Sequence, residues 1–351
     1  MSESRRHRNP SICSALLVTA LVFGAAHAES LAPAEQIAAE IDAGKHKGFE
    51  SFIMRVDGEI VGRAVTETYR SNRPPDLRSA TKSITALLVG IAIDQGKIAS
   101  VREPVSKLLP AREELFADDA RKAKITVEDL LTMRSGLDCN DWDPKSPGQE
   151  DKMYKQVDWV EAWAALPMRT EPGQEFSYCT GNAIALGEIV AVATGMSIDA
   201  FAIRYLFAPL GFERAEWAYW DNKRGVDTGG HLRVLPDDLL KIGDLVLAGG
   251  TYRGARIVSK EWIEAMTQDH TSIPKLPQRY GYLWWVHQIE DPQLPRTRLW
   301  WAQGNGGNLL MVMPELNSVI AITGTRFNRP DALEPMLWLR DRLLPAMKQG
   351  E

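Results

Sequence analysis

The sequence is poor in the residues that build metal sites and disulfide frameworks. Its 351 residues include three cysteines and six histidines, with no Cys-x-x-Cys and no two histidines three or four positions apart. Zinc sites usually place their ligands at such short spacings. The sequence also lacks the Gly-x-x-x-x-Gly-Lys-Ser/Thr loop that cradles nucleotide phosphates. We therefore expect no metal and no other cofactor.

Clusters of positive charge and long apolar runs are also scarce. The formal net charge is −5, and no Lys/Arg cluster is interleaved with aromatic residues, which argues against a nucleic-acid partner. The apolar run at residues 12–26 is short for a bilayer span, and it leads to Ala-His-Ala ending at Ala28, a signal-peptidase pattern. We expect a signal peptide at residues 1–28, cleaved after Ala28, and a periplasmic or secreted protein free of the membrane. An uncleaved membrane anchor is the alternative.

Strand-forming patterns gather at the two ends of the chain. After an expected helix at residues 32–43, two β-prone runs flank Asp57-Gly58, a strong hairpin signal. Near the other end, β-rich runs precede a closing helix that begins at Pro330. These runs cover residues 280–288, 308–314 and 317–325. Strands at both ends around a helical middle predict one sheet built from both termini, with a helical domain inserted.

The helical patterns carry signals for their ends. Thr126 is a candidate N-cap, Asp129 completes an acidic variant of the capping box, and Gly136 is the expected stop. A long apolar helix in the middle of the chain should end at Gly195. Another helix is expected over residues 79–96, where apolar residues recur at helical spacing.

Ser-x-x-Lys occurs twice, and the sequence around each match separates them. Ser79 and Lys82 open the predicted helix and should lie one turn apart on the same face. The match from Ser272 to Lys275 contains one proline and is followed by another, which forbid a helix. A helix N-terminus lowers the pKa of a nearby lysine and offers N–H groups to an oxyanion. Ser79 is the candidate nucleophile and Lys82 the candidate base, with an ordinary N-cap serine as the alternative.

Two further stretches carry candidate site residues. Tyr178 lies in a polar turn before an apolar helix, where a tyrosine can relay a proton; a half-buried structural tyrosine is the alternative. The glycines of "GNGG", which starts at Gly304, crowd the start of a strand and often mark close backbone approach to a ligand. A backbone N–H there, such as that of Asn308, is a candidate oxyanion donor, and a glycine bulge or tight turn is the alternative.

In this order, "SATK" at Ser79, "YCT" at Tyr178 and "GNGG" before a final hairpin resemble the serine β-lactamase/penicillin-binding-protein superfamily. The similarity spans roughly residues 40–340 and is greatest to the class C β-lactamase-like branch, which includes esterases, D-aminopeptidases and 6-aminohexanoate-dimer hydrolases. It implies a two-lobe α/β (α+β) fold, with an antiparallel sheet flanked by helices, an all-helical domain, and the site between them.

The resemblance implies one hydrolase domain over residues 29–351. Its sheet lobe would comprise about 29–100 and 250–351, and its helical lobe about 101–249. The small-molecule substrate would be an ester, an amide or a short peptide. The oligomeric state is left open.

The sequence departs from the family pattern at two of the three motifs. The second motif is often Tyr-x-Asn, but Thr180 holds the third place here and Asn182 follows two positions later. The third motif of β-lactamases is Lys-Ser/Thr-Gly, and the matching stretch here is Asn305-Gly306-Gly307. Because that lysine helps bind the substrate's carboxylate, its replacement favours an esterase or amidase over a β-lactamase or D,D-peptidase.

The expected activity is that of an exported serine hydrolase working through an acyl-enzyme on Ser79. Lys82, as a neutral amine or together with Tyr178, would take the proton, and Tyr178 would help pass it to the leaving group. The N–H of Ser79 and one from the Gly307-Asn308 segment would hold the oxyanion. A β-lactamase or D,D-peptidase is the first alternative, and a non-catalytic binding protein on the same scaffold is the second.

Two tryptophan pairs and two cysteines near the motifs each allow two structural interpretations. Trp284-Trp285 and Trp300-Trp301 either shape an apolar pocket for acyl or alcohol groups, with Trp301 as the candidate substrate contact, or pack in the core. Cys139 and Cys179 would remain after signal cleavage, as a disulfide in an oxidising compartment or as two buried thiols. A bridge would tie a loop to the wall of the site.

Overall fold

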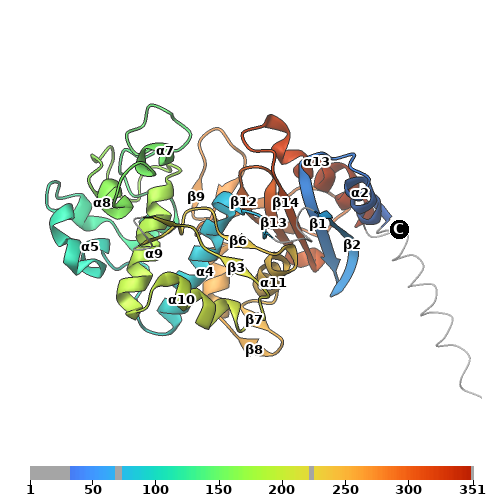
Figure 1. Ribbon diagram of the computed structural model, residues 1–351, viewed down its shortest axis with the longest axis horizontal. Helices are drawn as coiled ribbons and strands as arrows, with labels where there is room; N and C mark the ends of the chain where they lie inside the picture. The colour runs from blue at the N-terminus through green and yellow to red at the C-terminus, as the bar shows by residue number, and fades with distance from the viewer. Residues whose placement is uncertain (1–31, 68–72, 221–224, 349–351) are drawn as a thin grey trace, which may run out of the picture.

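The computed structural model describes residues 32–67, 73–220 and 225–348. The predicted signal peptide and its cleavage site lie outside the described residues. The two ends of the chain, blue and red in Figure 1, form one lobe around a sheet, and the middle of the chain forms a helical lobe beside it. This arrangement agrees with the two-lobe fold that the sequence predicts.

The sheet has eight antiparallel strands in the order β2-β1-β14-β13-β12-β11-β10-β9. β1 (Phe49–Val56) and β2 (Glu59–Val65) form the predicted hairpin, whose turn residues Asp57 and Gly58 both have positive φ. The other strands are β9 (Thr271–Ser272), β10 (Arg279–Tyr280), β11 (Trp285–Ile289), β12 (Thr297–Gly304), β13 (Asn308–Met313) and β14 (Ser318–Gly324). Because β1 pairs with β14, the two ends of the chain complete one sheet.

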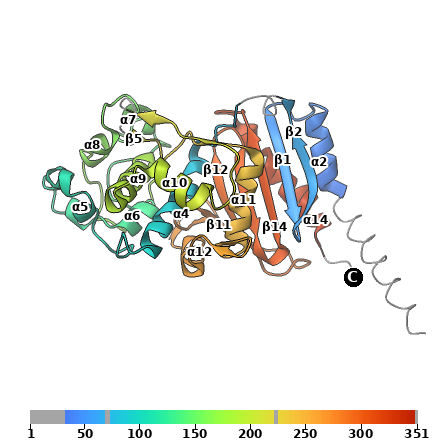
Figure 2. The ribbon, with the colours of Figure 1, turned by 60° about the horizontal axis from the view of Figure 1, so that its bottom comes forward.

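Helices cover both faces of this sheet. α2 (Ala32–Asp42) packs on β1 and β2, and α11 (Pro236–Leu247) packs on β1, β13 and β14. Gly62 faces α2 and Val319 faces α11, and the strand register places these two residues on opposite faces. α11 therefore belongs structurally with the sheet, although its sequence lies within the range expected for the helical lobe. Figure 2 shows α11 across the strands.

The closing helix begins at Pro330 as predicted, but it is not continuous. It is divided into η7 (Pro330–Leu333), α13 (Glu334–Trp338), η8 (Leu339–Leu343) and α14 (Leu344–Ala346), which include 3₁₀ and π turns. Pro335 and Pro345 lack the N–H that a continuous helix would need, which accounts for interruptions that the apolar pattern does not reveal.

α4 (Thr81–Asp94) and α9 (Thr180–Thr194) pack against each other at the centre of the helical lobe, although α4 lies within the range expected for the sheet lobe. α9 ends at Gly195 with φ 68°, as predicted. The shorter segments around them are η1 (Arg78–Ala80), α5 (Val105–Leu108), η2 (Pro110–Phe116), η3 (Lys122–Lys124), α6 (Val127–Leu131), α7 (Glu150–Met153), α8 (Trp159–Ala164), α10 (Ile198–Ala202) and η4 (Ile203–Phe207). α12 (Lys260–Met266) follows, and three short strand pairs, Ala215–Glu216 with Arg233–Val234, Tyr219–Trp220 with Gly225–Val226, and Thr251–Tyr252 with Ala255–Arg256, lie outside the main sheet.

α6 begins as predicted and ends earlier. Thr126 and Asp129 form the capping box, but the helix stops at Leu131 rather than near Gly136. Met133 takes the left-handed position that glycine usually fills, with φ 58°. The N–H groups of Met133 and Arg134 then close the helix on carbonyls of the last turn. A non-glycine residue in this position explains why the predicted stop was wrong.

In the part of the chain described here, no single helix has the length and apolar composition of a membrane span. A bent pair, Thr180–Thr194 with Ile198–Phe207, meets that test only when its two parts are joined.

Candidate active site

The turn that carries Ser79 is held by its neighbours. Arg78 lies in the left-handed region with φ 50°, which is uncommon for a residue with a side chain. Its N–H donates to Asp76 Oδ1 over 2.9 Å, and its guanidinium lies 4.4 Å above the Phe327 ring. η1 then leads directly into α4, so that Ser79 lies at the start of a helical segment, as its sequence context predicts.

The structure brings Ser79, Lys82 and Tyr178 together. Lys82 is 1% exposed, and its Nζ donates to Ser79 Oγ over 3.0 Å and to the Gly229 carbonyl over 2.6 Å. The Tyr178 ring centroid lies 5.1 Å from Lys82 Nζ, and interaction with the Ser79 side chain acts to lower the pKa of the Tyr178 phenol. A nucleophile, an amine and a phenol therefore lie in one cluster, which is the arrangement that activated serines require.

The surroundings of Lys82 shift its pKa in the direction opposite to the one expected at a helix N-terminus. Burial lowers its pKa, but Tyr178 and the carboxylates of Glu150, Asp141 and Asp227 act in the opposite direction, and together they raise the pKa above its ordinary value. Burial raises the pKa of Tyr178, although Lys82 and the Ser79 side chain oppose this shift. The pKa values of both groups are therefore raised, whereas a helix N-terminus alone would lower that of Lys82.

Thr180 connects the Tyr178 turn to two acids that the motifs do not include. Its N–H and hydroxyl lie 2.7 and 2.8 Å from Asp141 Oδ2, and the hydroxyl lies 2.9 Å from Glu150 Oε2. Burial raises the pKa of Asp141 to about 7, with Lys82 opposing the shift and Glu150 adding to it. Where the family often has asparagine, this chain therefore has a threonine bound to carboxyl groups.

Asn182 lies away from the site. It is fully buried, and its Oδ1 accepts a hydrogen bond from Trp163 Nε1 over 3.0 Å. Asn182 lies two positions after Thr180, so its side chain points about 200° around the axis of α9 from that of Thr180. Asn182 therefore packs inside the helical lobe.

A loop from Asp227 to His231 supplies the backbone acceptor for Lys82. Asp227 Oδ1 accepts the N–H groups of Gly229 and Gly230, and Oδ2 accepts from His231 Nδ1 over 2.7 Å. His231 Nε2 accepts from Arg78 over 2.6 Å. The hydrogen bond to Asp227 raises the pKa of His231. This loop fixes the Gly229 carbonyl beside Lys82 and links it to the turn that holds Ser79.

The glycine that contacts the serine turn is Gly304. A Cβ added there would lie 1.9 Å from the Leu77 carbonyl oxygen and 3.2 Å from Ala80 N, so only glycine fits. Asn305, the next residue, lines the same pocket as Ser79. The backbone beside Ser79 is therefore that of Gly304 and Asn305.

Gly306, Gly307 and Asn308 lie farther along and serve the turn into β13. A Cβ added at Gly306 would meet Phe327, and one added at Gly307 would meet Phe49. The Asn308 amide donates to the carbonyls of Asn305 and Gly324 over 2.7 and 3.2 Å. The structure thus brings Asn305 to the site and uses the three residues after it to hold the hairpin.

The pocket around Ser79 has a volume of about 380 Å³ and is mostly polar. Asp141, Glu150 and Asp151 line it together with Arg78 and His231. Acidic side chains thus outnumber the arginine among its described lining residues. No three His, Cys, Asp or Glu side chains in the described ranges are placed to hold a metal ion.

Cys139 and Cys179 form a disulfide, with their Cα atoms 5.4 Å apart. The bridge joins the residue after Tyr178 to the loop that contains Asp141 and Trp142. Trp142 stacks on Tyr178 with ring centroids 5.2 Å apart and an interplanar angle of 9°. One covalent link therefore positions an acid and an indole beside Tyr178.

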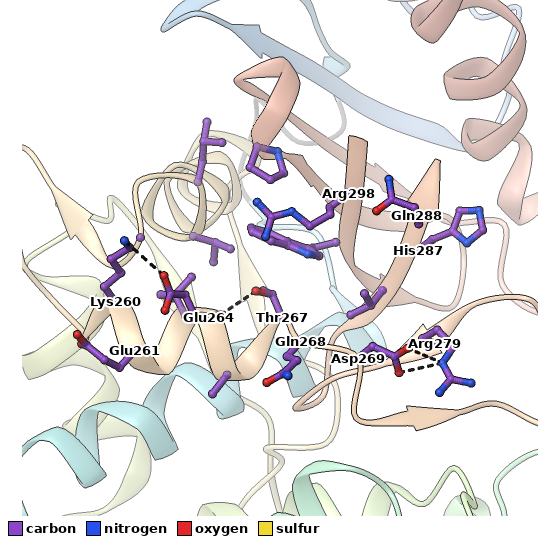
Figure 3. A pocket seen from close by; sticks show the side chains of 18 of the residues that line it. Lys260, Glu261, Glu264, Thr267, Gln268, Asp269, Arg279, His287, Gln288 and Arg298 are labelled. Carbon is purple, nitrogen blue, oxygen red and sulfur yellow. Dashed lines mark hydrogen bonds and ion pairs between the residues drawn. The ribbon is translucent and has the colours of Figure 1, made fainter. Parts of the chain in front are cut away.

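The tryptophan pairs divide between two faces of the sheet. Trp284 is fully buried and donates to the Ser83 carbonyl, whereas Trp285 and Trp301 stack on each other with centroids 5.7 Å apart. Trp300 lines a separate cavity of about 1080 Å³, shown in Figure 3, beneath the Arg298 guanidinium. Charged side chains of that cavity pair with one another, as in Lys260–Glu264 and Asp269–Arg279. Among the described residues, Ser79 does not line this cavity.

Asp141, Glu150, Asp227 and Gly304 are the main site residues that the motifs did not identify. Asp141 and Asp227 lie in two loops and Glu150 begins α7, and no common pattern in the sequence signals that they converge. Gly304 belongs to the predicted glycine cluster, but only the strand register selects it over Gly306 and Gly307.

Comparison with known families gives a match over residues 39–342 to the family described as Beta-lactamase. The chain belongs to the beta-lactamase family. Among the curated relatives of this beta-lactamase-family chain, a 6-aminohexanoate-dimer hydrolase of Paenarthrobacter ureafaciens is 27% identical over 270 residues. The matched region covers 73% of this chain and 64% of that protein, so the chain spans less than two thirds of the relative's length.

Solved structures share the beta-lactamase-family fold. A Bacillus anthracis protein provisionally named a 6-aminohexanoate-dimer hydrolase superposes with a TM-score of 0.72 at 17% identity, over 86% of this chain and 80% of that chain. A D-stereospecific amidohydrolase from Streptomyces gives a TM-score of 0.63 at 18% identity, over 88% and 97%. These similarities show that the chain shares the fold of these hydrolases.

Proposed function

We propose that this protein is a serine hydrolase that cleaves a small ester or amide through an acyl-enzyme on Ser79. The observation that carries the proposal is the 3.0 Å contact between Lys82 Nζ and Ser79 Oγ, with the Tyr178 ring centroid 5.1 Å from the same Nζ. Three residues from the first two family motifs thus meet in one cluster, within the family match.

In the proposed reaction, Ser79 Oγ attacks the substrate carbonyl while its proton passes to the Lys82–Tyr178 pair. The tetrahedral intermediate collapses as the C–O or C–N bond breaks, and the pair returns the proton to the leaving alcohol or amine. Water then attacks the acyl-enzyme by the same route, which releases the carboxylic acid and restores Ser79. The Ser79 N–H and the backbone at Gly304–Asn305 are the proposed oxyanion donors.

The raised pKa of Lys82 makes loss of its proton a prerequisite for this chemistry. The active form is the one in which the Lys82–Tyr178 pair has released one proton to solvent. Because the pKa of Lys82 is above its ordinary value, we expect kcat/KM to rise with pH through the alkaline range. A plateau that extends unchanged from acid to alkaline pH would contradict this assignment of the base.

The charges near Ser79 favour an ester or amide over a β-lactam. Asn305, which the sequence matches to the lysine of Lys-Ser/Thr-Gly, carries no charge, and neither does Ala302, two residues before the glycine that contacts the serine turn. Acids also outnumber the arginine around Ser79, which disfavours an anionic substrate. We expect a chromogenic cephalosporin to be hydrolysed far more slowly than a neutral ester.

The decisive experiment is intact-mass analysis after treatment with a fluorophosphonate probe. Ser272→Ala is a matched control because it removes the serine of the second Ser-x-x-Lys, which lies in strand β9 at the edge of the sheet. We expect one adduct on the parent protein and on Ser272→Ala, and none on Ser79→Ala. An unlabelled parent protein would favour a non-catalytic binding protein on this scaffold.

Export remains part of the proposal and rests on residues 1–28. N-terminal sequencing of the protein recovered from the periplasm or medium should begin at Glu29. A chain that stays in the cytoplasm with its first residues intact would refute export.

A further inference from the structure

An apolar groove lies beside the candidate site, on the face of the sheet covered by the C-terminal helical segments. It has a volume of about 610 Å³, and Trp285, Trp301 and Leu299 form its floor on β11 and β12. Leu276, Leu333 and Leu337 line it and are 44%, 42% and 48% exposed. Exposed leucines gathered around one hollow indicate a binding surface rather than the scatter found on most proteins.

The groove is continuous with the residues around Ser79. Trp142 stacks on Tyr178 and also on Trp285, with centroids 6.4 Å apart, and Trp285 stacks on Trp301. These contacts form an unbroken line of aromatic rings from Tyr178 into the groove. Trp142 is itself 51% exposed, so this line has an open side at the rim of the site.

Strand β12 makes the same connection along the backbone. Leu299, Trp301 and Gln303 occupy alternate positions and all line the groove. The strand then reaches Gly304, which contacts the serine turn, and Asn305, which lines the polar pocket. At about 3.3 Å per residue, the groove follows β12 for roughly 13 Å and ends at Gln303, one residue before Gly304.

We propose that this groove binds an alkyl or aryl group of the substrate whose carbonyl acylates Ser79. The proposal rests on the proposed function and adds a substrate class to it, namely esters or amides with an extended apolar group. The occupant is a small-molecule chain rather than a partner protein, because the stacked rings connect the groove to Tyr178, whose ring lies beside Lys82. The polar pocket on the other side of Ser79 would then hold the remaining, polar part of the substrate.

This proposal predicts a chain-length dependence. Each methylene that moves from water into the groove should raise kcat/KM about fourfold until the groove is filled. The test measures kcat/KM for p-nitrophenyl esters from acetyl to decanoyl and, in a second series, for acetate esters from methyl to octyl. A rise in at least one series supports the proposal, and flat or falling values in both overturn it.

Variants at exposed positions separate the groove from general effects. Leu337→Glu and Leu276→Glu place a charge at two exposed lining positions of the groove, where folding does not bury it. Both should abolish the rise for long chains. Ile203→Glu is the matched control, since Ile203 is 55% exposed on the helical lobe, and it should keep the rise.

The outcomes distinguish the two proposals. If the fluorophosphonate labels Ser79 but neither series responds to chain length, the groove proposal fails and the proposed function stands. If Ser79 is not reactive, both fail. Light scattering completes the test: a dimer that Leu337→Glu dissociates, together with flat chain-length series, would assign the groove to a second copy of this chain.

Discussion

At the scale of single residues, the acids around Lys82 control when the site can work. Asp141 is one of the carboxylates that raise the pKa of Lys82. Asp141→Asn removes that charge and should lower the pKa of Lys82. The rising limb of the kcat/KM profile should then move about one pH unit toward acid, the smallest shift that one nearby charge usually causes in a pKa. Profiles of both proteins with the same ester test this. An unmoved limb would show that Asp141 does not act on the base.

Gly304 provides the second test at this scale. Gly304→Ala places a Cβ against the Leu77 carbonyl and should push the strand away from the serine turn, lowering kcat/KM at least about 100-fold. Gly307→Ala is the comparison, because Gly307 has φ 89° and a Cβ there meets Phe49 instead. That variant should lose stability by about 1–3 kcal/mol and still react with the fluorophosphonate. Equal loss of labelling in both variants would contradict the placement of the site at Gly304.

The sequence could predict those site residues whose relation is local. Ser79 and Lys82 are one helical turn apart, and Tyr178 directly precedes α9, so short patterns carry their positions. Asp141, Glu150 and Asp227 meet only because two loops and the start of α7 fold onto Lys82. These acids raise the pKa of Lys82, and short sequence patterns do not show that they lie beside it.

At the scale of elements, the disulfide holds the loop of Asp141 and Trp142 against the start of α9. Its cysteines are 40 positions apart. In the chain-entropy model, a closed loop of this length contributes about 4 kcal/mol to the free energy of unfolding. We expect Cys139→Ser/Cys179→Ser to lose stability of this order in denaturant titrations and to show lower kcat/KM. Reductant should then affect the parent protein and leave the double variant unchanged.

Element ends could be predicted where one residue type decides them. The Asp57-Gly58 turn, the Thr126–Asp129 capping box and the stop at Gly195 all formed as expected. The end of α6 could not be predicted, because Met133 adopts the left-handed conformation without being glycine. Its sulfur accepts the Cys179 N–H over 3.4 Å, so a tertiary contact accompanies this conformation.

At the scale of the whole molecule, strand patterns at both ends sufficed to predict one shared sheet, since each end alone leaves unpaired strand edges. The position of α11 did not follow from its place in the sequence. It lies within the helical middle, yet its buried face, including Leu239, Ile242 and Leu245, packs on the sheet. An amphipathic pattern shows that a helix has a partner, and only the fold shows which partner it is.

The free energy of unfolding should depend on pH because the carboxyl group of Asp141 is buried in the folded protein. Asp141 has a folded-state pKa of about 7 and an ordinary value of 3.8, so the folded protein holds this proton more tightly than the unfolded chain. The stabilisation that the Asp141 proton gives is therefore fully present below pH 3.8 and is lost as pH rises through about 7. At about 1.4 kcal/mol per pKa unit, this loss is about 4 kcal/mol. Relative to the parent protein, Asp141→Asn should lose less stability between these pH values, as measured by urea unfolding, whereas Asp151→Asn should follow the parent. Parallel curves for the parent and Asp141→Asn would mean that Asp141 is ionised throughout this range, and Lys82 would then face a full negative charge even in acid.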